Sequence, residues 1–130
     1  IYGYANYSHL YGGAGEDVMY GGLYNTLYVS ATGADKLYGN VGVDTFYFRP
    51  LDSNNVQGRD TIYNFDVTKD WIQLNMSDMG VKNFTIDVAS SNHVVIGTAD
   101  NSFAVDLVGF DTTKIHLLDD RMQMNVGSTV

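Results

Sequence analysis

Large hydrophobic or aromatic residues recur at every ninth position in the first third of the chain, between polar and glycine-rich stretches. Residues 3–47 divide without gaps into five blocks of nine, each long enough for a six-residue turn and a three-residue strand. Two blocks complete one coil of a flattened roll, so blocks two apart stack. The pattern therefore predicts a short parallel β-roll over residues 3–47. The inward-facing eighth positions are Leu10, Met19, Tyr28, Leu37 and Phe46, of which Tyr28 fits an apolar core least well.

The rest of the chain shows an ordinary alternation of apolar and polar residues, which favours an antiparallel cap. No polar linker separates the two parts, so we expect one all-β module over residues 1–130 with a shared core, the roll at 3–47 and the cap at 48–130. The cap strands are predicted at 83–89 (NFTIDVA), 93–99 (HVVIGTA), 102–110 (SFAVDLVGF) and 114–120 (KIHLLDD), with turns at 90–92 (SSN) and 100–102 (DNS).

The second block carries a specific motif. Its sequence, GGAGEDVMY at residues 12–20, fits the calcium-binding nonapeptide G-G-x-G-x-D-x-U-x at every specified position. The fourth and fifth blocks keep a glycine and an aspartate in the same phase. Glycines permit left-handed backbone angles and close approach, which leaves carbonyl oxygens in the gap between stacked turns, and the aspartate adds a carboxylate. Because Ca²⁺ takes about six to eight oxygen ligands, the repeat predicts calcium between stacked turns.

The sixth position of each block determines which edge of the roll carries carboxylates. Asp17 and Asp35 share one edge, whereas the other edge carries Ser8, Thr26 and Asp44. The upper turns of this second edge lack carboxylates and should bind calcium weakly or not at all. We expect the best site between the turn that ends at Asp17 and the turn that ends at Asp35. The candidate ligands in the repeats are Gly12, Ala14, Gly15, Asp17, Thr32, Gly33, Asp35, Gly42 and Asp44.

The charge and the cysteine content of the chain exclude several classes of binding partner. The formal net charge is -8, and fourteen of the fifteen acidic residues are aspartates. Such a surface repels nucleic acids and anionic membranes. Cysteine is absent, so disulfides and thiolate zinc sites are excluded, and a bound cation is the alternative way to hold a secreted protein together. No stretch is long and apolar enough for a membrane helix, and the N-terminus lacks the layout of a conventional signal peptide, so export requires another route or a signal outside this sequence.

These blocks resemble the repeats-in-toxin (RTX) family, the C-terminal modules of bacterial proteins exported by type I secretion. The family typically follows its last repeat with an apolar strand, a polar loop, a D-x-I-x-D-F stretch and then D-x-I-x-L; residues 44–74 read DTFYFRPLDSNNVQGRDTIYNFDVTKDWIQL. Asn64 stands where the family has its second aspartate, and this departure is expected to weaken a terminal calcium site. The matching residues are Asp60, Ile62, Phe65, Asp70, Ile72 and Leu74.

The resemblance implies a location and a role. It implies a calcium-binding module that is secreted or at the bacterial cell surface, in which Asp60 adds a ligand at the edge of Asp17 and Asp35. It also implies that the cap closes the open end of the roll, which prevents edge-to-edge aggregation, and that secretion information lies near the C-terminus. The segment DDRMQMNVGSTV at 119–130 is either that signal or a last strand with a frayed end.

The residues contain no catalytic constellation. His9, His93 and His116 lie far apart in the sequence, in no metal-ligand spacing, and a G-x-S-x-G motif is absent. Asp119 and Asp120 are adjacent, so on the predicted strand they point to opposite faces, which is wrong for an acid/base pair. We therefore expect a binding or folding module rather than an enzyme.

Nine of the ten tyrosines precede residue 48, and four of them occupy the outward-facing ninth position of a block. Neighbouring strands lie about 4.8 Å apart, so Tyr20 and Tyr38 should stack as a ladder. Tyr11 and Tyr47 should flank Val29 on the other sheet. Such aromatics either bind sugar rings or another protein, or simply cover the roll. Three further tyrosines fall at turn positions and suggest that the second edge has exchanged calcium for aromatic packing: Tyr4, Tyr7 and Tyr24.

Three functions remain open. The first is a calcium-dependent module for folding and export, disordered where calcium is submicromolar and folded outside the cell. The second is carbohydrate recognition, by resemblance to the alginate-binding repeat modules of secreted epimerases. Basic residues are few and scattered here, so a neutral glycan on the tyrosines is the better version of this hypothesis. The third is a self-assembling S-layer, adhesin or fibre component, in which identical subunits meet through tyrosines and flat strands.

Overall fold

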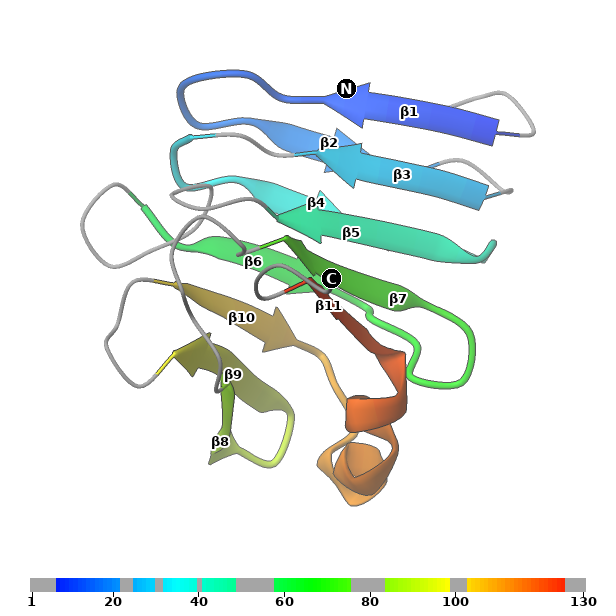
Figure 1. The fold of residues 1–130 in the computed structure, drawn as a ribbon, viewed down its shortest axis with the longest axis vertical. Helices are drawn as coiled ribbons and strands as arrows, with labels where there is room; N and C mark the ends of the chain where they lie inside the picture. Colours follow the sequence, from blue (N-terminus) through cyan, green and yellow to red (C-terminus); the bar gives the residue numbers. More distant parts are fainter. Residues whose placement is uncertain are drawn as a thin grey trace.

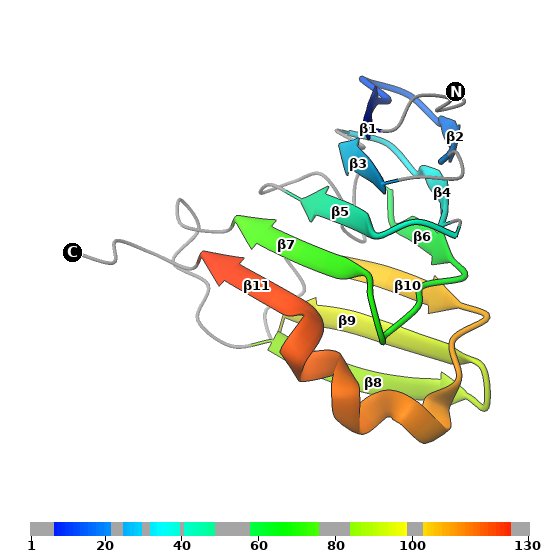
Figure 2. The ribbon, with the colours of Figure 1, turned by 90° about the vertical axis from the view of Figure 1, so that its right-hand side faces the viewer.

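In the computed structural model, two β-sheets face each other across one core and a 3-10 helix lies at one end (Figures 1 and 2). The structure describes residues 7–21, 25–29, 32–39, 41–48, 58–75, 84–98 and 103–125. The strand orders are β1-β3-β5-β7-β11 and β2-β4-β6-β10-β9-β8. The elements are β1 (Tyr7–Tyr11), β2 (Val18–Tyr20), β3 (Asn25–Val29), β4 (Lys36–Tyr38), β5 (Asp44–Phe48), β6 (Asp60–Tyr63), β7 (Trp71–Asn75), β8 (Phe84–Ser90), β9 (His93–Thr98), β10 (Ala104–Val108), η2 (Thr112–Arg121) and β11 (Met122–Asn125).

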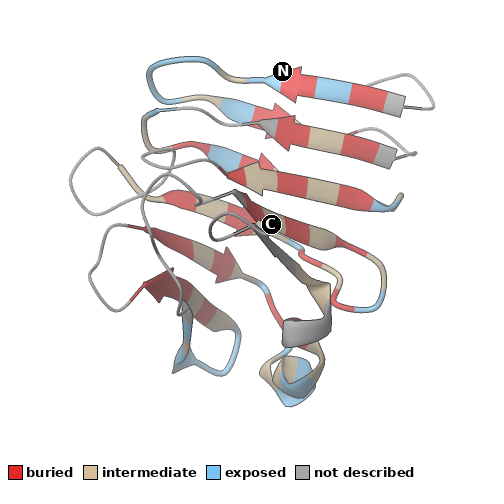
Figure 3. Cartoon of the chain, in the orientation of Figure 1, coloured by how far each residue is buried: buried red, intermediate tan, exposed pale blue. Residues whose placement is uncertain are grey.

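The nine-residue period of the sequence forms the predicted roll. Parallel pairs join blocks two apart: Leu10 lies beside Tyr28, and Tyr28 lies beside Phe46. In the other sheet, Met19 lies beside Leu37. All five side chains are buried, and Figure 3 shows buried positions alternating with part-exposed ones along β5. The predicted inward-facing positions are therefore confirmed.

Tyr28 is the eighth-position residue that fits an apolar core least well, and the structure shows how it is accommodated. Its ring stacks on Phe46 with 4.5 Å between centroids. Its hydroxyl donates a 2.5 Å hydrogen bond to the backbone carbonyl of Tyr38 in the opposite sheet. Burial raises the pKa of the Tyr28 hydroxyl far above its usual value, so the group remains a neutral donor that ties the two sheets together.

The parallel roll continues beyond the repeats. β6 adds to β4 with Thr61 beside Lys36, and β7 adds to β5 with Trp71 beside Thr45. Each sheet then gains another parallel strand from the C-terminal part, β10 beside β6 and β11 beside β7. The pairs β10–β9 and β9–β8 are antiparallel. The predicted antiparallel cap is therefore confirmed for these two pairs, while β10 also joins β6 in parallel and β11 extends the parallel sheet of β7.

Two similar turns form part of this extension, NFDVTK at 64–69 and GFDTTK at 109–114. Each begins with a residue of positive φ, Asn64 at 63° and Gly109 at 78°. In each turn the aspartate accepts hydrogen bonds from the backbone and hydroxyl of the threonine two residues later. The rings of Phe65 and Phe110 lie 6.4 Å apart. The chain thus adds a further coil, which lies outside the nine-residue period and is not apparent from it.

The prediction of a strand at 114–120 is wrong, because this segment lies within η2. The carboxylate of Asp111 accepts hydrogen bonds of 3.1 and 2.6 Å from the backbone and hydroxyl of Thr113, which caps the start of the helix. Leu118 then enters the core, and Figure 2 shows η2 below the sheets between β8 and β11. Asp119 and Asp120 are therefore on a helix, and their side chains lie outside the described part.

The other predicted cap elements lie as follows. The strands predicted at 83–89, 93–99 and 102–110 correspond to β8, β9 and β10, and a turn lies within 90–92 as expected. The turn predicted at 100–102 lies outside the described residues. Arg59 and His93 both contact Asp106 Oδ1, at 2.6 and 2.9 Å, and so connect β9 and β10 to the start of β6. Within the described segments, no helix is long and apolar enough to cross a membrane.

Candidate calcium site

A column of three aspartates follows one edge of the roll, which we call the Asp17 edge (described residues 12–17, 32–35 and 58–60; left side of Figure 1). The backbone N–H of Asp17 donates a 2.8 Å hydrogen bond to Oδ1 of Asp35. The backbone N–H of Asp35 donates a 2.9 Å hydrogen bond to Oδ1 of Asp60. The carboxylates of Asp35 and Asp60 are therefore each oriented by the turn above them. The structure brings these three predicted residues together.

Glycines make this close stacking of turns feasible. Gly15, Gly33 and Gly58 lie one above another with φ of 97°, 112° and 126°, a conformation that side chains disfavour. A Cβ atom on Gly33 would lie 2.0 Å from the carbonyl oxygen of Gly15, and one on Gly58 would lie 2.7 Å from the carbonyl carbon of Gly33. Backbone carbonyls therefore lie at the interface between successive turns. The remaining candidate ligands at this edge belong to the same turns: Gly12, Ala14 and Thr32.

One carboxylate oxygen at the Asp17 edge lacks a donor. Oδ2 of Asp17 is buried and has no hydrogen-bond partner within the described part of the chain. A buried polar atom without a partner is costly, and a bound ion is one way to satisfy it. Carbonyl and carboxylate oxygens are the ligands that Ca²⁺ prefers, so the residues present fit this ion. Among the described side chains, no three His, Cys, Asp or Glu residues form a metal-binding group, so a site here depends on backbone carbonyls as well as carboxylates.

Gly42 and Asp44 lie on the opposite edge and do not join this group. We call this the Asp44 edge (described residues 41–44 and 64–70; right side of Figure 1). Asp44 lies in register below Thr26 and Ser8, as predicted, so the upper turns of this edge present hydroxyls instead of carboxylates. The predicted tyrosines of those turns lie outside the described residues, or in the case of Tyr7 only the backbone is described.

The sequence-based ligand set omits Asp70, which continues the column below Asp44. The carboxylate of Asp70 accepts hydrogen bonds of 2.9 and 2.8 Å from the backbone N–H groups of Asp44 and Asp66. Burial raises the pKa of Asp70 to about 6, although both hydrogen bonds oppose the shift. The signal for this position was present in the sequence, because Asp70 precedes β7 as Asp60 begins β6.

The tyrosine ladder forms as predicted and is longer than expected. The rings of Tyr20 and Tyr38 lie 4.7 Å apart, and those of Tyr38 and Tyr63 lie 4.5 Å apart, each pair within 10° of parallel. Both faces of the Tyr38 ring are therefore covered by its neighbours. On the other sheet, Tyr11 and Tyr47 flank the strand position of Val29 in the predicted register, and Tyr11 is 61% exposed.

Comparison with known proteins agrees with this geometry. Residues 1–23 and 25–49 match the family model of the RTX calcium-binding nonapeptide repeat (4 copies). The solution structure of the AlgE6R2 subunit of the Azotobacter vinelandii mannuronan C5-epimerase is similar over 95% of this chain and 90% of that chain, with a TM-score of 0.69 and 24% identity. The AlgE6R3 subunit is similar over 92% and 75%, with a TM-score of 0.64 and 26% identity. A search of curated proteins finds no significant match. The first 49 residues thus carry RTX calcium-binding nonapeptide repeats, and the chain folds as an RTX-type β-roll.

Proposed function

We propose that the chain is a non-catalytic module that binds calcium between the turns of the Asp17 edge and folds as it does so. The observation that carries the proposal is the column Asp17–Asp35–Asp60, in which stacked glycine turns place carbonyls beside oriented carboxylates. The proposed ligands come from the two turns that end at Asp17 and Asp35, with Asp60 oriented below them. Gly42 and Asp44 belong to the other edge and are not part of this site.

Linkage explains how calcium would drive folding. Without the ion, the carboxylates of one column repel each other, and glycine-rich turns lose much conformational entropy when they become ordered. With the ion, the free energy of binding adds to the free energy of folding. Affinities of about 10⁻⁴–10⁻³ M are usual for extracellular calcium modules. The repeats of the Asp17 edge would then be disordered inside a cell and folded outside it.

The same proposal includes export. An RTX repeat that folds only in millimolar calcium suits a bacterial protein that crosses a type I secretion channel unfolded and acts outside the cell or at its surface. For the C-terminal segment, residues 122–125 form β11 on β7, which agrees with the last-strand alternative for these positions. Residues 126–130, where a secretion signal would also fall, lie outside the described residues.

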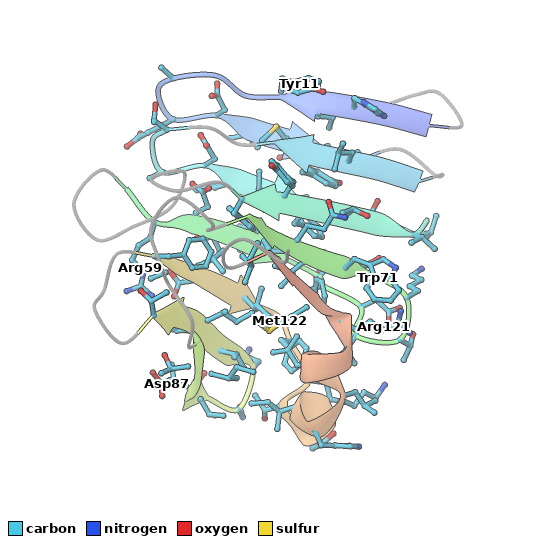
Figure 4. All side chains as sticks on the ribbon, viewed as in Figure 1. Tyr11, Arg59, Trp71, Asp87, Arg121 and Met122 are labelled. Atoms are coloured by element: carbon cyan, nitrogen blue, oxygen red, sulfur yellow. The ribbon has the colours of Figure 1, made fainter. Side chains whose placement is uncertain are left out.

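Calcium titration of the intact chain tests the proposal. Calorimetry followed by circular dichroism should show saturable binding coupled to a gain of β signal. Asp17→Asn should lose most of the binding, whereas Asp87→Asn is the matched control, because Asp87 is exposed on β8 and far from the Asp17 edge (Figure 4). Equal binding by both variants, or the same β signal in chelator as in calcium, would contradict the proposal. Sedimentation of the same samples would reveal calcium-dependent assembly of identical subunits.

A second candidate function is recognition of a neutral polysaccharide. The two similar structures are subunits of a mannuronan C5-epimerase, and a groove of about 320 Å³ lies on the β1–β3–β5–β7 sheet. The described residues that line it include no Asp, Glu, Lys or Arg, which suits a neutral ligand rather than an acidic one. The groove is a better place for a sugar than the tyrosine ladder, because the faces of the Tyr38 ring are covered. The lining residues are Ser8, His9, Thr26, Leu27, Val43, Thr45 and Gln73.

Affinity electrophoresis in gels containing neutral polysaccharides tests this second function. Retention that falls in Gln73→Ala and persists in a Tyr20→Ala, Tyr38→Ala double variant would support the groove. Retention lost only in the double variant would assign the sugar to the ladder instead. Absence of retention for the parent protein would end the hypothesis.

A further inference from the structure

The turns of the Asp44 edge already hold positive charges of the chain itself. The ammonium group of Lys69 donates a hydrogen bond to the backbone carbonyl of Val41 in the turn above. Val41 is the third residue of its block, the position that Ala14 occupies at the Asp17 edge. The carbonyl equivalent to a proposed calcium ligand is therefore bound by a lysine at this edge.

A second cation occupies the next turn. Arg121, the last residue of η2, donates hydrogen bonds of 3.0 and 2.7 Å from Nε and Nη2 to the carbonyls of Val67 and Thr68. Its guanidinium lies 4.6 Å from the centre of the Trp71 ring, and the two side chains lie together in Figure 4. This stacking fixes the guanidinium in place. Two successive turns of the Asp44 edge thus have carbonyls bound by a cationic side chain.

The surroundings explain why positive charge is needed there. Asp44 and Asp70 are fully buried at this edge, and Asp66 lies 3.9 Å from the Lys69 ammonium. The carbonyls and carboxylates of the Asp44 edge therefore create a negative potential of the same kind as the one that calcium would meet at the Asp17 edge. A cation on a side chain is already attached to the fold, so it does not lose translational freedom when it binds. A calcium ion at this place would have to displace it.

We propose that Lys69 and Arg121 are tethered cations that replace calcium at the Asp44 edge, so that calcium dependence is confined to the Asp17 edge. Lys69 is then the residue that determines which edge binds metal. The inference rests on the proposed function only for the Asp17 edge. The lower coils, formed by β5, β7 and β11, should keep their order without calcium, while β2 and β4 require it.

Hydrogen exchange of the full chain, with and without chelator, tests the inference. In chelator, the parent should keep protection in β5, β7 and β11. Lys69→Met should exchange at least tenfold faster in β5 and β7 in chelator, and millimolar calcium should restore part of the protection, because the Val41 carbonyl becomes accessible to the ion. Lys36→Met is the matched control, since it removes the same charge from an exposed position on β4, and it should leave β5 and β7 unchanged.

The outcomes separate this inference from the proposed function. The proposal that Lys69 and Arg121 replace calcium would be overturned by either of two results. One is an unchanged exchange rate in β5 and β7 of Lys69→Met, and the other is loss of protection in β5 and β7 of the parent in chelator. If Lys69→Met is unfolded under all conditions, Lys69→Arg decides: a charge at this place should restore protection, and failure to do so overturns the inference. If protection in β2 and β4 is the same with and without calcium, the calcium site at the Asp17 edge is contradicted. The role of Lys69 is then judged separately, from the exchange rates in β5 and β7.

Discussion

The backbone N–H of Asp17 donates a 2.8 Å hydrogen bond to Oδ1 of Asp35 in the turn one coil below. One carboxylate therefore has two roles: it orders the turn above it and contributes charge to the proposed calcium site. The two roles can be separated, because an amide keeps the acceptor oxygen and removes the charge. This separation gives the first prediction.

Asp35→Asn and Asp35→Ala should each lower calcium affinity at least tenfold, and neither should change stability in chelator, because the Asp17 edge is then already disordered. In saturating calcium, Asp35→Ala should be about 1–2 kcal/mol less stable than Asp35→Asn, because the Asp17 N–H then lacks its acceptor. Calorimetry measures the affinities, and urea denaturation in saturating calcium measures the stabilities. Equal stability of the two variants would show that the hydrogen bond does not stabilise the turn.

Gly33→Ala should prevent the turns of the Asp17 edge from stacking. The substitution combines a backbone of φ 112° with a Cβ 2.0 Å from the Gly15 carbonyl oxygen, and we expect a loss of at least about 3 kcal/mol. Gly13→Ala is the matched control, because Gly13 has φ of 80° but nothing within 4 Å of its Cβ position. It should lose only about 1–2 kcal/mol for the backbone conformation. Urea denaturation in saturating calcium would measure both, and similar losses would contradict the close approach of the turns.

Tyr28→Phe should lower the free energy of unfolding by about 1 kcal/mol, the usual contribution of one intramolecular hydrogen bond. The ring would keep its stacking on Phe46, and only the bond from the hydroxyl to the Tyr38 carbonyl would be lost. Tyr11→Phe provides the control, because Tyr11 is exposed. A stability change as small as that of the control would mean that the Tyr28 hydroxyl does not connect the sheets.

The roll and its two edges could be predicted from the sequence because each repeats a local rule. A residue such as Met19 enters the core because its block has the same nine positions as the next block in its sheet, and the stacking of Tyr20 on Tyr38 follows from the same phase. In the Asp17 column, Asp17 and Asp35 followed from their positions within their blocks, whereas Asp60 lies beyond the blocks and was expected from the resemblance to the RTX family. The contacts between blocks depend only on the position of each residue within its nine-residue block.

The remaining contacts depend on pairings that no local period encodes. β11 lies on β7 although η2, β8, β9 and β10 intervene, and the start of η2 depends on one cap at Asp111 in a segment whose apolar pattern also suits a strand. The contact between Lys69 and Val41 requires the register of β5 on β7 before it can be inferred. The nine-residue pattern therefore does not predict contacts that depend on the register between strands far apart in the sequence.

The two ends of the roll should respond differently to core truncation. Leu118 and Met19 are both fully buried, but Leu118 closes the lower coils and Met19 lies between the calcium-dependent turns. Leu118→Ala should cost about 2–5 kcal/mol with or without calcium, because the tethered cations hold its surroundings in both conditions. Met19→Ala should cost a similar amount in calcium and nothing measurable in chelator, because β2 is then already disordered. Urea denaturation of both variants in calcium and in chelator provides the four values. A Met19→Ala cost that persists in chelator would show that the upper coils fold without the ion, and the calcium dependence of the roll would have to be abandoned.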